Sequence, residues 1–151
     1  MKKILLIFII VSLTSCAGLP GKSTLTVFSP IDKESGIYLS KINIEPRTAL
    51  SGLAGEIPEL VNSLLTSKGF RLVGNQLEAD IELEIFIHRK SYTYNFNSFE
   101  SVTMTMKLYQ QKVIAAYLMY TEDTDRSLDS FIWTFSLLEH NIAALAARLH
   151  E

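Results

Sequence analysis

The most regular feature of the chain is a strict alternation of apolar and polar residues in two neighbouring segments. Every second residue over 81–87 is Ile or Leu, and every second residue over 102–108 is Val, Met or Leu. A period of two predicts β-strands that bury one face. We expect a turn near 95–98, which would place Ile87 opposite Met106 so that both apolar faces point the same way.

Three further segments are expected to form strands, namely residues 24–27, 37–44 and 113–120. In the second of these the apolar positions change parity between Leu39 and Ile42, which a β-bulge would explain. The third segment is apolar on both faces, which is typical of a strand that is central in the sheet or covered on both sides.

Two segments have apolar residues at helical spacing and predict helices over about 55–68 and 128–149. Pro58 suits the first turn of the first helix, and Gly69 suits its end. The second helix carries its apolar stripe at Leu128, Phe131, Phe135, Leu138, Ile142, Leu145 and Leu149. This order predicts a two-layer α+β domain, in which an antiparallel sheet of about four to five strands carries both helices on one face.

The N-terminus has the pattern of an export signal. Two lysines follow Met1, residues 4–11 are apolar without interruption, and Leu13-Thr14-Ser15-Cys16 follows. These four residues resemble the lipobox of bacterial lipoproteins. The resemblance implies a signal peptide over 1–15, cleavage between Ser15 and Cys16, and diacylglycerol on the Cys16 thiol with an acylated (palmitate-type) new N-terminus.

Lipidation would make the mature protein a domain held at a bilayer surface, because two or more acyl chains bind a membrane durably. Residue 17 is Ala instead of Asp, which by resemblance to Gram-negative lipoproteins favours the periplasmic face of the outer membrane. We expect the lipidated Cys and a flexible tether over 16–23, followed by one periplasmic domain over 24–151.

Composition adds mainly exclusions. The 151 residues include 14 Lys and Arg against 16 Asp and Glu, so no basic patch for nucleic acid is expected. A single Cys excludes an internal disulfide and a cysteine-based zinc site.

The layout also resembles a family. A helix that ends in a Leu-rich, Gly-stopped turn (ELVNSLLTSKGFRLV) precedes Ala79-Asp80, and the alternating strand IELEIFI follows. Together with the lipobox, this layout resembles the YajG-like lipoproteins and, more loosely, the LptE-like lipopolysaccharide-assembly lipoproteins. The LptE-like resemblance implies a partner and plug for an outer-membrane barrel, and no functional residue is transferred.

No catalytic motif or cofactor motif is recognised. His88, His140 and His150 lie in no zinc-binding pattern, and no phosphate-binding Gly-rich loop occurs. Residues 123–129 begin like a calcium loop, but Leu128 stands where Gly is needed, so helix capping explains them better. Glu82 and Glu84 are expected on the solvated face of their strand. We therefore expect no enzyme, no metal and no cofactor.

The most suggestive segment is aromatic. Tyr92, Tyr94 and Phe96 share the parity of Phe86, while the opposite parity becomes polar, so the apolar face changes sides along this strand. Either the strand bulges and these rings join the core, or a hairpin presents them outward, with Phe99 nearby, as a contact for an envelope protein or a membrane interface.

Three functional hypotheses follow. The first is a non-enzymatic, lipid-anchored module for protein interaction or assembly at the outer membrane. The second is an LptE-like role in lipopolysaccharide assembly. The third is an envelope hydrolase, which would need a pocket that gathers His88 or His140 with a carboxylate.

Overall fold

The computed structural model describes residues 21–32, 34–45, 55–124 and 131–149, and of residues 124 and 131–133 the backbone only. The signal peptide, Ser15, Cys16 and most of the tether lie outside the described residues. The described elements, in chain order, are β1 (Lys22–Val27), β2 (Gly36–Glu45), α2 (Ile57–Ser67), β3 (Arg71–Leu72), the short 3-10 helix η2 (Gln76–Glu78), β4 (Ile81–Tyr94), β5 (Asn97–Gln110), β6 (Val113–Thr124) and α3 (Phe131–Leu149).

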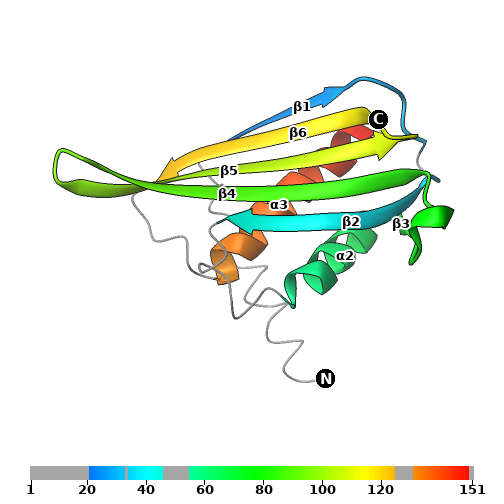
Figure 1. The fold of residues 1–151 in the computed structure, drawn as a ribbon, viewed down its shortest axis with the longest axis horizontal. Coiled ribbons are helices and arrows are strands. Elements are labelled where there is room, and N and C mark those ends of the chain that lie inside the picture. Colours follow the sequence, from blue (N-terminus) through cyan, green and yellow to red (C-terminus); the bar gives the residue numbers. More distant parts are fainter. Residues whose placement is uncertain (1–20, 33, 46–54, 125–130, 150–151) are drawn as a thin grey trace.

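The six strands form one sheet in the order β1-β6-β5-β4-β2-β3 (Figure 1). Strand β2 runs parallel to β4 and β3, whereas the other neighbours are antiparallel. The sheet is therefore mixed and has more strands than the sequence predicts. The parallel pair arises because α2 lies between β2 and β4 in the chain and returns it to the same end of the sheet.

Both helices pack on one face of the sheet, and α3 passes behind the strands in Figure 1. This confirms the two-layer α+β architecture. The core is formed by the inward residues of the central strands and the apolar faces of the helices. Fully buried members include Val61, Leu65, Ile81, Leu83, Ile85, Met104, Met106, Leu108, Leu118, Leu138 and Ile142.

Local signals act as expected from the sequence. The register of β2 against β4 shifts between Leu39 and Lys41, which is the predicted bulge. Pro58 lies in the first turn of α2, where its missing N–H costs no hydrogen bond. Gly69 has a φ of 89° just beyond the helix, and the next amide, that of Phe70, closes the turn by donating to the Leu65 carbonyl at 3.1 Å.

The predicted register of the central hairpin is wrong by two residues. Ile87 lies opposite Met104, and Ile85 lies opposite Met106. The turn consists of Asn95 and Phe96 alone, and so it is tighter than the predicted 95–98. A shift by an even number of residues leaves every side chain on its predicted face, so the core is unaffected.

Among the described helices, none is both long enough and apolar enough to cross a membrane. The part of the predicted second helix over 128–130 lies outside the described residues, and α3 begins at Phe131.

Candidate functional site

The β4–β5 hairpin extends well beyond the rest of the sheet (Figure 1). Strand β2 ends at Glu45, opposite His88, and β6 ends at Thr124, opposite Glu100. Farther out, the two strands pair only with each other in the described part of the chain, up to Tyr94 and Asn97. Within the described part of the chain, the tip is thus a two-stranded ribbon without a hydrophobic core beneath it.

Two left-handed residues close this ribbon. Asn95 has a φ of 47° and Phe96 a φ of 64°, which is the signature of a tight two-residue hairpin turn. Asn tolerates this region, but Phe does not adopt it readily, because its Cβ approaches the neighbouring carbonyl oxygen. The exposed fraction of Phe96 is 102%, so its ring gains no burial in return.

The aromatic residues on the two strands of the hairpin, Tyr92, Tyr94 and Phe99, lie on the sheet face opposite the helices. The pairing of β4 with β5 shows no bulge, so Tyr92 and Tyr94 keep the outward parity of Phe86. Tyr92 stacks on Phe99 across the strands, with 5.7 Å between ring centroids. The exposed fractions of Tyr92 and Tyr94 are 39% and 65%. Of the two alternatives left open by the sequence, the outward hairpin is the observed one.

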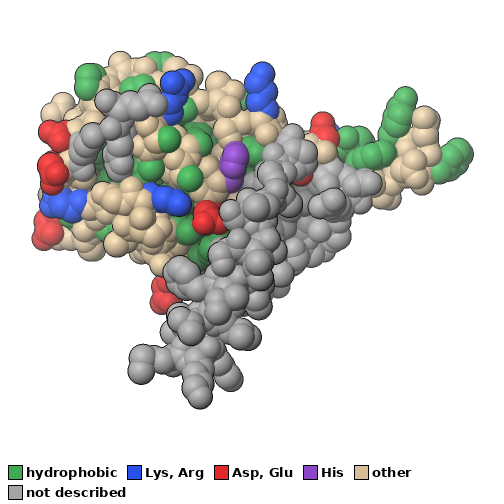
Figure 2. Space-filling view, turned by 180° about the vertical axis from the view of Figure 1, so that it is seen from behind, with side chains coloured by type: hydrophobic (Ala, Val, Ile, Leu, Met, Phe, Trp, Pro, Cys, Tyr) green, Lys and Arg blue, Asp and Glu red, His purple; other side chains and the backbone are tan. Residues whose placement is uncertain are grey.

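Hydrophobic side chains therefore collect at the end of the projection, away from the body of the molecule (Figure 2). Their neighbours at the base are charged. Arg89 takes the inward parity after Ile87 and pairs with Glu100 at 2.9 Å, with only 9% of the Arg89 side chain exposed. The inward face of β4 thus changes from apolar to charged at Arg89, opposite the last buried core residue of β5 on this side, Val102.

The histidines do not assemble a catalytic site in the described residues. His88 is exposed and lies 3.7 Å from a similarly exposed Glu45 carboxylate, and it does not line the polar cavity at the other end of the sheet. His140 meets the edge of the buried Tyr120 ring. His150 and residues 125–129 of the calcium-like run lie outside the described residues. Among the residues that the structure does describe, no group of three metal-ligating side chains occurs.

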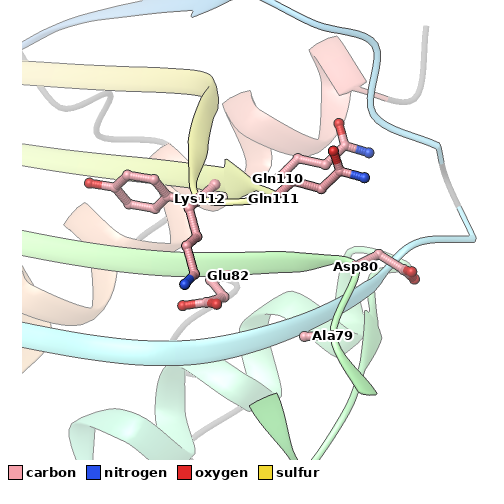
Figure 3. A pocket seen from close by; sticks show the side chains of 7 residues that line it. Ala79, Asp80, Glu82, Gln110, Gln111 and Lys112 are labelled. Atoms are coloured by element: carbon pink, nitrogen blue, oxygen red, sulfur yellow. The ribbon is translucent and has the colours of Figure 1, made fainter. Parts of the chain in front are cut away.

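A polar cavity of about 360 Å³ lies at the opposite end of the sheet from the hairpin tip. Its lining residues are Ala79, Asp80, Glu82, Tyr109, Gln110, Gln111 and Lys112. Lys112 extends toward Glu82, while the two glutamines point away from them (Figure 3). Asp80 is already engaged, because it accepts from the Gly36 amide at 2.7 Å. The cavity contains no histidine, so the pocket required for the hydrolase hypothesis is not found here.

The outward face of the sheet mixes polar and aromatic side chains, among them Phe86, Tyr109 and Tyr117. Phe86 lies between Lys41 and Lys107, and each ammonium is 5.2 Å from the ring centroid. Glu82 and Glu84 lie on this face as predicted. The Tyr109 hydroxyl donates to Glu84 at 3.2 Å, and desolvation, followed by the charge of Glu84 and this hydrogen bond, raises the pKa of Tyr109.

A buried polar cluster under β1 and β6 has no counterpart in the sequence-based expectations. The Tyr120 hydroxyl donates to Glu122 at 2.6 Å, and burial followed by this hydrogen bond raises the pKa of Tyr120 far above its usual value. Nearby, Ser23 donates to Asn141, whose amide donates to the Leu137 carbonyl. Asn141 is fully buried within the apolar stripe of α3. Its position between Leu138 and Ile142 is the sequence signal from which this burial could have been predicted.

Comparisons with known proteins show the fold. No family model and no curated protein matches the chain. Among solved structures, PelC of Paraburkholderia phytofirmans, a dodecamer, matches with a TM-score of 0.54 and 15% identity over 85% of this chain and 96% of that one. A DUF4136 family protein of Bacteroides thetaiotaomicron matches with a TM-score of 0.50 and 10% identity over the same shares.

A PDZ domain protein of Parabacteroides distasonis matches with a TM-score of 0.53 and 15% identity, over 90% of this chain and 39% of that one. Two bacterial lipoproteins, from Neisseria meningitidis and Acinetobacter baumannii, match with TM-scores of 0.42 and 0.36, which are too low to establish a shared fold. No YajG-like or LptE-like protein is named among the matches described.

Proposed function

We propose that the protein is a non-enzymatic, lipid-anchored lipoprotein that acts as an interaction or assembly module at the outer membrane. Its anchor is Cys16, and its contact region is the hairpin tip with Tyr92, Tyr94, Phe96 and Phe99. The observation that carries the proposal is the projecting ribbon, which exposes three aromatic rings beyond the sheet. Tyr and Phe are enriched where proteins meet partners or the membrane interface.

The cost of the tip supports a role outside the molecule. Phe96 holds an unfavourable backbone conformation and buries nothing, and Tyr94 is mostly exposed. Folding stability alone would favour Gly at Phe96. Such residues are explained by contacts that another envelope component provides, be it a protein or a lipid.

A crosslinking scan tests the contact region. A photo-reactive amino acid at Tyr92, Tyr94 or Phe96 in living cells should capture an envelope component. The matched control is Leu77, which is 92% exposed and precedes β4 at the opposite end of the sheet. Capture at the hairpin positions that does not exceed capture at Leu77 would contradict the proposed contact region.

The anchor needs its own test. Mass spectrometry of native protein should find cleavage after Ser15 and three acyl chains on the new terminus at Cys16. The variant Cys16→Ser should lose this modification and its flotation with outer-membrane fractions. An unmodified, uncleaved N-terminus in the native protein would refute the lipoprotein proposal.

The LptE-like role in lipopolysaccharide assembly is the second candidate. One observation favours it, since Lys41 and Lys107 on the outward face supply cations beside Phe86 for an anionic glycolipid. Glu82, Glu84 and Glu45 on the same face weaken this attraction. Depletion of the protein should reduce surface lipopolysaccharide if this role holds, and unchanged lipopolysaccharide would exclude it.

A further inference from the structure

The hairpin tip and the start of β1 lie at the same end of the sheet. A continuous row of paired residues crosses five strands, and it consists of Lys22, Thr121, Thr103, His88 and Glu45. The described chain thus enters its first strand at the level where the hairpin begins to project, as Figure 1 shows for β1, β4 and β5. The segment that leads back to Cys16 starts beside the base of the hairpin.

The lengths of the two extensions match. From the row of His88 to the last pair at Tyr94, the hairpin adds six residues, or about 20 Å at the rise of a β-strand. From Lys22 back to Cys16 the sequence also counts six residues, which span at most about 20 Å. A bilayer that holds acyl chains on Cys16 is therefore within reach of the hairpin tip.

The chemistry of the tip suits the polar boundary of a bilayer. Residues 91–99 contain no charged side chain and consist of Ser, Tyr, Thr, Asn and Phe. Tyrosine rings prefer this boundary, where the ring contacts hydrocarbon and the hydroxyl remains hydrated. At the base of the projection, Lys22 and Lys90 are exposed at a level where lipid phosphates would lie.

From these observations we infer that the hairpin tip enters the interface of the same leaflet that holds the acyl chains of Cys16. Phe96 enters deepest, with Tyr92 and Tyr94 at the level of the head groups. This inference rests on the proposed lipid anchor, which keeps the tip at a high effective concentration near the bilayer. Two attachment points fix the orientation of the domain, which a single attachment point does not do.

A fluorescence experiment on the full acylated protein tests the inference. Cys16 is the only cysteine, so Ser98→Cys introduces the only free thiol, and an environment-sensitive dye is attached there. Ser98 lies exposed in the tip, opposite Thr93. The matched control is Ser67→Cys, an exposed position at the end of α2, away from the hairpin. Both proteins are reconstituted into vesicles of phosphatidylethanolamine and phosphatidylglycerol that carry a shallow spin-labelled lipid.

We expect a blue shift and spin-label quenching of the dye at Ser98 and neither at Ser67. Replacing Tyr92, Tyr94 and Phe96 together by Ser should abolish both signals at Ser98 while the protein still floats with the vesicles. A dye at Ser98 that stays as hydrated as the dye at Ser67 in floating protein overturns the inference and leaves the anchor intact.

The remaining outcomes are equally decisive. Protein that does not float with the vesicles refutes the anchor and, with it, this inference. If crosslinkers at Tyr94 and Phe96 capture an envelope protein and no lipid in cells, the contact is proteinaceous, which overturns the membrane assignment but supports the interaction module.

Discussion

The turn at the hairpin tip allows a quantitative prediction for Phe96→Gly. A bulky residue in the left-handed region costs about 1–2 kcal/mol of folding free energy. Gly removes this cost, but part of the gain is lost again because Gly gives the unfolded chain more conformational freedom. Because the Phe96 ring is fully exposed, no packing is lost. We expect a net local gain of about 1 kcal/mol, which corresponds to about fivefold slower amide exchange at the last pair, Tyr94 and Asn97.

Native-state hydrogen exchange followed by NMR measures this gain directly. The β5–β6 turn provides the control, since Gln111 and Lys112 have φ values of 52° and 66°. Lys112→Gly should slow exchange in its own turn to a similar extent and leave the vesicle signal of the tip unchanged, whereas Phe96→Gly should weaken that signal. Faster exchange in Phe96→Gly would refute the reasoning, because it would mean that the ring stabilises the folded hairpin.

The buried cluster around Tyr120 yields three further predictions, each measured by urea unfolding. Tyr120→Phe should lower the free energy of unfolding by about 2 kcal/mol, since Glu122 loses its buried hydrogen-bond donor. If Tyr120→Phe lowered it by the same amount in a protein that already carries Glu122→Gln, this explanation would be contradicted. Gly21→Ala should cost about 1–3 kcal/mol, because its Cβ would lie 2.1 Å from the Tyr120 ring; an unchanged midpoint would disprove the close approach. Because the pKa of Tyr120 is raised in the folded state, this tyrosine ionises first in the unfolded chain. The free energy of unfolding should therefore be unaffected by this group below pH 10.0 and fall by up to about 1.4 kcal/mol per pH unit above it. The same dependence on pH in Tyr120→Phe would argue against this cause.

Much of the fold was predictable because local patterns and packing agree. The alternation over 81–87 fixes which face of β4 is buried, and the bulge after Leu39 was visible as a change in parity. The register of the hairpin was not predictable in the same way, because the apolar pattern repeats every two residues and cannot distinguish shifts of two. The position of the turn distinguishes these registers. Asn95-Phe96 has the Asn of the usual Asn-Gly turn sequence but lacks its Gly, so the sequence does not mark the turn clearly.

Long-range features were missed for a different reason. The parallel pairing of β2 with β4 depends on where α2 returns the chain, which no local pattern encodes. The burial of Asn141 is compensated by a hydrogen bond from Ser23, which is distant in sequence. The aromatic tip was recognised as unusual, but only the ends of β2 and β6 show that the rings project beyond the core.

The length of β4 sets the scale of the molecule relative to the bilayer. Its 14 residues span about 45 Å from Ile81 to Tyr94. With the aromatic end immersed, the length of this strand determines how far the glutamine-rich rim around Gln110 and Gln111, at the other end of the sheet, lies from the lipid. In this orientation, any soluble molecule that meets this rim would approach from the aqueous side, far from the lipid that holds the other end.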